Sequence, residues 1–319
     1  MLSAVLTIGM LLLGFVLLVK GADFFVEGSS SVAKTLKVPS LVIGMTVVAM
    51  GTSLPELSVS VTASLNNANS LAISNVIGSN MFNLIVVLGA SALVCNIPVG
   101  KDVLKRDLPF SIFCVILLVV LGLIGSELGH VDGIILLALF VGFLVVMVLA
   151  AMKARRDAAD DEEEEIKVLP IWLSLLYIVG GAVAIKFGGD WVVDSAVKIA
   201  TFLGASETLI GLTIVACGTS LPELATSMVA AKKNEMDMAV GNVVGSNIFN
   251  VLLILGTAAA ISPLALLTEN LIDIVILVVA SVVLLIFGAT AKQLDRKEGI
   301  IMLISYAAFL GYIIARAYL

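Results

Sequence analysis

The chain has 319 residues, is 60% hydrophobic and only 13% charged, and has a mean hydropathy of +1.16. Soluble domains are about 45–50% apolar and about 25% charged, so this composition excludes an ordinary soluble protein and indicates a membrane protein. The formal net charge of −6 comes largely from Asp157 and the acidic run 160–165. The rest of the chain is nearly neutral, and no basic patch predicts binding to nucleic acid.

Cysteine and histidine give no sign of a metal centre or a cofactor site. Cys95, Cys114 and Cys217 lie in or beside apolar segments without ligand spacing, and we interpret them as packing residues. The single histidine, His130, lies in a predicted loop and cannot build a multi-histidine metal site. We therefore expect no prosthetic group and a protein that is not an enzyme.

Apolar segments follow one another along the whole chain. A membrane-spanning helix needs about 20 apolar residues. The predicted spans, in chain order, are 2–20, 39–64, 70–94, 108–125, 131–152, 169–187, 208–230, 238–262, 270–290 and 299–317. The first lacks a basic start and a clear cleavage site, so we expect it to be retained rather than removed as a signal peptide. The sequence thus predicts an all-α membrane protein with ten transmembrane helices.

The lysines and arginines test the order of these spans. If the N-terminus is outside, 15 of the 18 basic residues fall on one side of the membrane, and three fall on the other: Lys186, Lys198 and Arg316. Because basic loops stay in the cytoplasm, we expect a multi-pass plasma-membrane protein with both termini outside. The acidic segment 153–167 is then a flexible cytoplasmic linker. We interpret it as a solvated hinge, with regulation by bound cations as the alternative.

The chain repeats itself at an offset of 167 residues. Residues 44–56 (GMTVVAMGTSLPE) return as 211–223 (GLTIVACGTSLPE), and residues 75–83 (NVIGSNMFN) return as 242–250 (NVVGSNIFN). The predicted domains are a first repeat over 1–152 with its motif region at 39–94, the linker 153–167, and a second repeat over 168–319 with its motif region at 208–262.

Each repeat holds five predicted spans. Because five is odd, the second repeat enters the membrane from the opposite side, and the two are inverted about a pseudo-two-fold axis in the membrane plane. Inverted repeats are typical of secondary transporters that bind their substrate near the midplane. Channels can also be built in this way, so the repeat alone leaves the mode of transport open.

Two carboxylates among 24, Glu56 and Glu223, are predicted to lie deep within apolar spans. Burying an ionised carboxylate in a membrane costs at least a few kcal/mol unless it is compensated. Oxygen-bearing side chains occur four residues apart, hence on one helix face, in the pairs Thr52 with Glu56, Ser79 with Asn83, Thr219 with Glu223, and Ser246 with Asn250. Hydroxyl, amide and carboxylate oxygens are hard ligands, which suit Na⁺ and Ca²⁺.

A proline precedes each of these glutamates. Pro55 and Pro222 have no N–H, so the carbonyls of Gly51 and Gly218 lose their helical partners. Free carbonyls at membrane depth are tolerated where they line a polar cavity or are buried in protein. The residues alone therefore predict a symmetric transporter of hard cations.

The doubled GTSLPE motif at 51–56 and 218–223, with GSN at 78–80 and 245–247, resembles the two α-repeats of the cation/calcium exchanger superfamily. The resemblance is closest to the prokaryotic sodium/calcium exchangers and covers essentially the whole chain. It implies a ten-helix, usually monomeric antiporter that exchanges Na⁺ for Ca²⁺ across the lipid bilayer by alternating access. It also implies that the first and sixth helices slide across the other eight.

The resemblance also implies which residues hold the ions. Calcium would be bound by Glu56, Glu223 and the backbone carbonyls of Thr52 and Thr219. Sodium would use the same glutamates together with Ala49, Ser53, Ser79, Asn83, Ala216, Ser220, Ser246 and Asn250. The potassium-dependent branch is expected to carry a carboxylate where this chain has Asn250, which argues against potassium co-transport.

The two carboxylates of the site set the charge that one transport cycle would move. One Ca²⁺ or two Na⁺ would neutralise them, so the three-for-one exchange usual in that family would move one net charge per cycle. A proton/calcium exchanger of the same fold is the first alternative, and it differs in its driving ion. A cation channel is the second, and a receptor or structural membrane protein is the third, against which the lack of a sizeable soluble domain argues.

Overall fold

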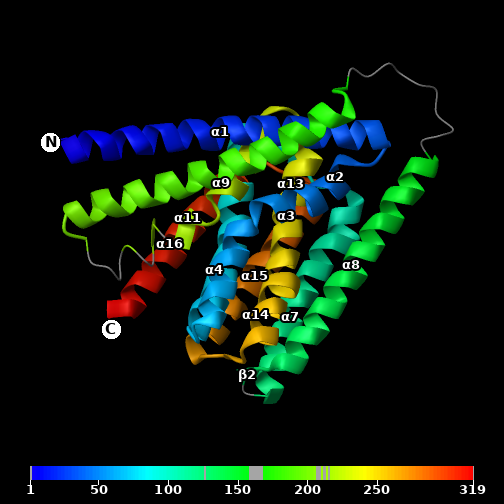
Figure 1. Cartoon of the computed structure of the whole chain (residues 1–319). Coiled ribbons are helices and arrows are strands. Elements are labelled where there is room, and N and C mark those ends of the chain that lie inside the picture. Colours follow the sequence, from blue (N-terminus) through cyan, green and yellow to red (C-terminus); the bar gives the residue numbers. More distant parts are fainter. Residues whose placement is uncertain are drawn as a thin grey trace.

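The structure, a computed structural model, describes residues 2–125, 127–157, 168–205, 210, 213–214 and 216–318. It is built almost entirely of helices (Figure 1). The start of the predicted linker, residues 153–157, continues a long helix, and the rest of the predicted linker, up to residue 167, lies outside the described residues.

The described residues form α-helices (α), π-helical turns (η) and short strands (β). The first half of the chain forms α1 (Leu2–Leu36), α2 (Ser40–Ile43), η1 (Gly44–Val48), α3 (Ala49–Thr52), α4 (Leu54–Leu65), α5 (Asn69–Met81), η2 (Phe82–Val87), α6 (Leu88–Val94), β1 (Ile97–Pro98), η3 (Val103–Asp107), α7 (Leu108–Gly125), β2 (Glu127–Leu128) and α8 (His130–Asp157). The second half forms α9 (Ile171–Phe202), α11 (Ala216–Gly218), α12 (Leu221–Lys232), α13 (Met236–Phe249), η6 (Asn250–Leu255), α14 (Gly256–Ile261), β3 (Leu264–Ala265), α15 (Thr268–Ala291), β4 (Gln293–Leu294) and α16 (Arg296–Tyr318).

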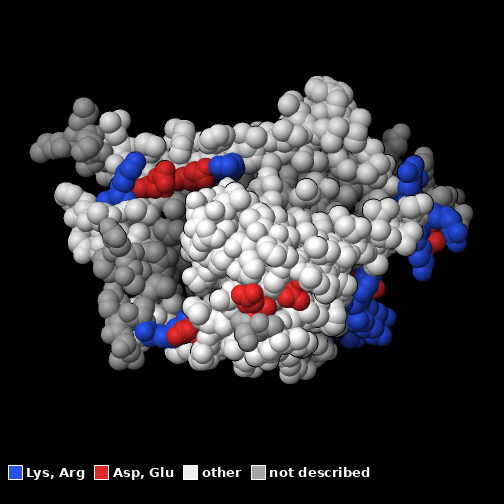
Figure 2. All heavy atoms as spheres, turned by 60° about the horizontal axis from the view of Figure 1, so that its bottom comes forward, with Lys and Arg blue, Asp and Glu red and all other residues white. Residues whose placement is uncertain are grey.

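Most of the described helices are long and apolar enough to cross a membrane. Eight such segments are Leu6–Leu36, Asn69–Val94, Val103–Ile124, His130–Asp157, Ile171–Phe202, Met236–Ile261, Thr268–Thr290 and Arg296–Arg316. The pair Ser40–Thr52 and Leu54–Leu65, bent by 49°, makes a ninth if it counts as one span. The predicted span 208–230 lies partly outside the described residues. Charged side chains form only small groups on the face shown in Figure 2, as expected for a helical membrane protein.

The first and sixth predicted spans are parts of longer helices. α1 continues past its predicted end at residue 20 to Leu36, and α9 continues past residue 187 to Phe202. The predicted ends were wrong because charged residues, such as Asp23 and Asp190, interrupt the apolar runs. In the structure these charges pair with lysines, Asp23 with Lys233 and Asp190 with Lys186, so the helices continue through them.

Glycines bring α1 and α9 into direct backbone contact, and the two helices run side by side in opposite directions (Figure 1). A Cβ atom added at Gly21 would lie 2.9 Å from the carbonyl oxygen of Gly181, and one at Gly181 would lie 2.8 Å from that of Gly21. Gly14 and Gly188 make the same contact one step along, with 3.0 and 2.8 Å. Small residues at the interface are the usual means of close helix packing in membranes, and here they join α1 and α9 into one unit.

Two short antiparallel strand pairs connect the halves of the chain. β1 pairs with β4, with Ile97 opposite Leu294, and β2 pairs with β3, with Leu128 opposite Leu264. The offset of 167 residues relates β1 to β3 and β2 to β4. Each pair therefore joins a strand of the first half to a strand of the second, and the two pairings are reciprocal.

The contact between α1 and α9 can be tested with neighbouring glycines. Gly181→Ala is expected to destabilise the purified protein by about 1–3 kcal/mol, because the added methyl forces the helices apart. Gly180→Ala is the matched control, since a Cβ there meets no atom within 4 Å and alanine favours a helix by about 1 kcal/mol. Thermal unfolding in detergent measures both, and an equal loss in the two variants would contradict the close contact.

Candidate functional site

Glu56 and Glu223 each lie in the first turn of a helix that begins at a break. α3 ends at Thr52 and α4 begins at Leu54, with Ser53 between them at φ −84° and ψ 10°. Ser220 has the same place before α12, with φ −91° and ψ 7°. A carboxylate in the first helical turn is favoured by the helix dipole. The local structure therefore places both glutamates at newly started helices, as the two prolines predict.

The two glutamates are held by serines of the opposite half. Ser53 Oγ donates to Glu223 Oε1 over 2.8 Å, and Ser220 Oγ donates to Glu56 Oε1 over 3.0 Å. Both glutamate side chains are fully buried. The structure thus brings the four predicted residues together at one place, where each half completes the environment of the other half's carboxylate.

A second pair of serines reaches the same oxygen atoms from α5 and α13. Ser79 Oγ lies 3.5 Å from Glu56 Oε1, and Ser246 Oγ lies 3.4 Å from Glu223 Oε1. These serines are fully buried, as the sequence predicts for residues of the site. The groups that donate to the two carboxylates are therefore hydroxyls, which carry no positive charge to neutralise them.

Several other oxygens of the site have no hydrogen-bond partner within the part of the chain that the structure describes. They are buried, and they are Oε2 of Glu56, Oε2 of Glu223, Oδ1 of Asn83 and Oδ1 of Asn250. Buried polar atoms in proteins are almost always paired, so an unpaired set at one place asks for a ligand. Oxygens of this kind can coordinate a hard cation such as Na⁺ or Ca²⁺.

The remaining predicted residues lie around this pair. Thr52 is fully buried, and its hydroxyl donates to Asn242 Oδ1 over 3.1 Å, so its side chain is engaged across the halves. Thr219 lies in the turn before α12 with its hydroxyl buried. Ala49 packs against α13, where a Cβ at Gly245 would lie 2.9 Å from its methyl. Ala216 begins α11, and its side chain lies outside the described residues.

One group of asparagines was not predicted as part of the site. Asn80 Nδ2 donates to the backbone oxygen of Asn247, and Asn247 Nδ2 donates to that of Asn80, each over 3.3 Å. Asn250 Nδ2 donates to Asn80 Oδ1 over 2.9 Å, which leaves Asn250 Oδ1 free. Both residues lie in the repeated NVxGSNxFN segment, so the offset of 167 was the signal that could have found them.

A similar pair supports the carboxylates from behind. Asn75 Nδ2 donates to Ser60 Oγ over 3.0 Å, and Asn242 Nδ2 donates to Ser227 Oγ over 2.9 Å. These contacts hold α4 to α5 and α12 to α13, so that each glutamate-bearing helix is fixed to its serine-bearing neighbour. In the residues that the structure describes, no group of three or more His, Cys, Asp and Glu side chains could hold a metal ion. The oxygens around the two glutamates are therefore the strongest candidate for a cation site.

The chain is similar to known proteins over most of its length. The family model described as sodium/calcium exchanger protein matches residues 6–149 and 173–315. The chain belongs to this family. The resemblance that the doubled motif predicted is confirmed, and membership identifies a cation/calcium antiporter of the membrane.

Relatives in this exchanger family cover almost the whole chain. The putative antiporter CaxA of Alkalimonas amylolytica is 39% identical over 94% of this chain and 95% of its own length. The sodium/calcium exchanger MaX1 of Methanosarcina acetivorans is 32% identical over 94% and 96%. A solved structure of the sodium-calcium exchanger NCX_Mj, soaked with 2.5 mM Na⁺ and 10 mM Sr²⁺, has a TM-score of 0.82 and 37% identity, with 99% of each chain covered.

The asparagine pair gives a prediction for this family member. Asn80→Ala removes the amide that holds Asn247 and Asn250, so buried polar groups lose their partners, and we expect a loss of about 2 kcal/mol in stability. Asn66→Ala is the control, because that amide is exposed and bonds only to the carbonyl of Thr62 in its own helix. Unfolding in detergent measures both, and an unchanged Asn80→Ala variant would show that the pair contributes nothing.

Proposed function

We propose that the chain is a secondary active antiporter that exchanges Na⁺ for Ca²⁺ across the plasma membrane, with the ions bound between Glu56 and Glu223. The observation that carries this proposal is the pair of buried carboxylates, each hydrogen-bonded by a serine of the opposite half. A buried pair of carboxylates with unpaired oxygens is costly unless a cation compensates it. The exchanger relatives support the choice of ions.

The ligand sets follow from the positions of these oxygens. Calcium is held by both glutamates and by the backbone carbonyls of Thr52 and Thr219, next to the helix breaks. Sodium ions use the glutamates with the surrounding residues Ala49, Ser53, Ser79, Asn83, Ala216, Ser220, Ser246 and Asn250. The unpaired Oδ1 atoms of Asn83 and Asn250 support this set, because each is a hard oxygen donor with nothing else to bind among the described residues.

The proposed architecture is a monomer of ten transmembrane helices in two inverted repeats, 1–152 and 168–319. The reciprocal strand pairs, the crossed serine–glutamate bonds and the glycine contacts are all consistent with the offset of 167 residues. Lysines and arginines flank β1 and β4, which pair, at Lys101, Lys105, Arg106, Lys292, Arg296 and Lys297. That supports a cytoplasmic location for this side, with both termini outside.

Alternating access is proposed to come from movement of α1 and α9 as one unit. Their glycine-lined contact joins them more closely to each other than side chains would allow. Movement of this unit across the remaining helices would open the site first to one side and then to the other. Two carboxylates, three Na⁺ and one Ca²⁺ leave one net charge moved per cycle. Asn250, a neutral residue, supports exchange without potassium.

Replacing either glutamate tests the site directly. Glu56→Gln or Glu223→Gln is expected to reduce sodium-driven ⁴⁵Ca²⁺ uptake into proteoliposomes to background, because one negative charge cannot neutralise a divalent cation. Glu269→Gln is the control, since this carboxylate is exposed in the first turn of α15 and should leave uptake unchanged. Exchange retained in either site variant would disprove the assignment.

The driving ion is tested by imposing sodium, potassium and proton gradients separately. We expect calcium uptake with the sodium gradient only. Uptake driven by a pH gradient without sodium would indicate a proton/calcium exchanger instead, and single-channel currents would indicate a channel.

The proposed three-for-one exchange predicts sensitivity to voltage. One net charge feels about 2.3 kcal/mol per 100 mV, so clamping the membrane at 100 mV with potassium and valinomycin should change the equilibrium calcium ratio about 50-fold. Glu269→Gln proteoliposomes should show the same dependence. A calcium ratio indifferent to the clamp would show that exchange is electroneutral.

A further inference from the structure

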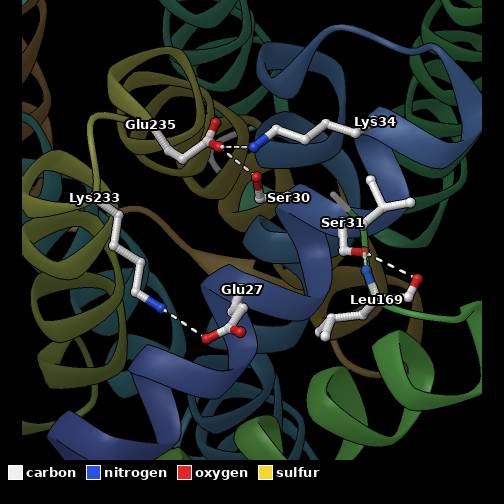
Figure 3. A pocket seen from close by; sticks show the side chains of 8 residues that line it. Glu27, Ser30, Ser31, Lys34, Leu169, Lys233 and Glu235 are labelled. Atoms are coloured by element: carbon white, nitrogen blue, oxygen red, sulfur yellow. Dashed lines mark hydrogen bonds and ion pairs between the residues drawn. The ribbon is translucent and has the colours of Figure 1, made fainter. Parts of the chain in front are cut away.

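Charged side chains join the second half of α1 to the turn between α12 and α13 (Figure 3). Lys233 Nζ in this turn lies 2.7 Å from Asp23 Oδ1 and 3.2 Å from Glu27 Oε2. It also donates to the backbone oxygen of Asp23 over 3.0 Å. One lysine of the second half of the chain therefore binds three oxygens of α1.

A second set of contacts lies further along α1. Lys34 Nζ lies 3.2 Å from Glu235 Oε1, which also accepts a hydrogen bond from Ser30 Oγ, and Ser40 Oγ donates to Glu235 Oε2 over 2.9 Å. Burial alone would raise the pKa of Glu235, but the two serine hydroxyls and the charge of Lys34 outweigh it and lower this pKa. Glu235 is thus ionised in the folded protein and pairs with Lys34 throughout the neutral range.

These groups line a cavity of about 420 Å³ that also touches the start of the second half of the chain. Leu169 N–H donates to Ser31 Oγ over 2.9 Å, and Ser31 Oγ lies 3.3 Å from the carbonyl oxygen of Leu169 (Figure 3). We call Asp23, Glu27, Lys34, Lys233 and Glu235 the clasp.

The repeat shows that the clasp exists in one half only. The offset of 167 residues relates Asp23 to Asp190 and Glu27 to Asp194, so the carboxylates are present in α9. Their partners are not, because Lys233 corresponds to Asn66 and Glu235 corresponds to Ala68. In the structure Asp190 pairs instead with Lys186 of its own helix, over 2.6 Å.

The two sides of the candidate site also differ in shape. Where α1 is fastened to the α12–α13 turn, the other side has a cavity of about 330 Å³ between α9 and α4, lined by Asp190, Asp194, Ser58, Thr219 and Pro222 among others. This cavity reaches the second GTSLPE motif. The clasp lies towards the β1–β4 side, since Cys95, shortly before β1, contacts the carbonyl of Ala231 beside it.

We propose that the clasp is a conformational lock, which closes the β1–β4 side of the ion site while the cavity on the β2–β3 side stays open to it. This inference rests on the proposed alternating access. When the movement of α1 and α9 is reversed, α9 comes to the α4–α5 turn, where Asn66 and Ala68 offer no charge. The ion pairs therefore stabilise one of the two states only. They act as a built-in bias in an otherwise symmetric scaffold.

The bias should be modest, because the paired side chains are between 15% and 45% exposed. Partly exposed ion pairs contribute little, and we expect loss of Lys233 to change the ratio of the two states about fivefold, or about 1 kcal/mol.

Thiol labelling in detergent measures that ratio without any need for transport. In a background without Cys95, Cys114 and Cys217, one reporter is Ser58→Cys, which lines the open cavity, and the other is Ala225→Cys, its equivalent on α12 beside α1. The quotient of their labelling rates follows the ratio of the two states.

Lys233→Gln should lower the quotient about fivefold, and Lys233→Arg should restore it. Lys232→Gln is the matched control, because this neighbouring lysine is exposed, and it should change nothing. Asn66→Lys leaves the native clasp intact and offers α9 a partner in the opposite state, so it should lower the quotient too.

An unchanged quotient in both Lys233→Gln and Asn66→Lys would overturn the proposal, and so would an equal effect of Lys232→Gln. If Lys233→Gln fails to fold, Asn66→Lys alone decides. Absence of ⁴⁵Ca²⁺ uptake by the cysteine-free protein, together with the expected shift in labelling, would disprove the proposed exchange while the lock stands.

Discussion

The structure depends on the neutralisation of two carboxylates that have no water around them. Glu56 and Glu223 are fully buried, and the groups that donate to them are serine hydroxyls. Hydroxyls lower the cost of a buried charge without removing it, so the site favours a bound cation. The helix breaks, the crossed serines and the fixed asparagines all serve to hold oxygens around this one point.

Much of the site could be predicted because the chain states it twice. The repeat marked Glu56, Glu223 and their oxygen-bearing neighbours, and the structure places most of these residues together. The sequence could not show that Ser53 serves Glu223 and not Glu56, because that contact joins residues 170 positions apart. The role of Asn80 was missed for the same reason, since its partner Asn247 is 167 positions away.

The length of α1 and α9 shows where hydropathy misleads. A charged residue after an apolar run predicts a loop, because an unpaired charge does not belong in a membrane. Asp23 and Glu27 are in a helix all the same, because Lys233, more than 200 positions later, compensates them. The fold class was predictable from composition, whereas the boundaries depended on tertiary ion pairs that no local pattern contains.

The crossed serines have a consequence for how this protein can change over generations. Each serine tunes the carboxylate of the other half, so a substitution in one motif alters the affinity of its twin. The two copies of GTSLPE are therefore bound to one another and resist divergence, although 167 residues separate them. Positions without a crossed partner are free to drift, as Lys233 and Asn66 have done. A duplicated scaffold of this kind stays symmetric at its centre and becomes asymmetric from its edges inward.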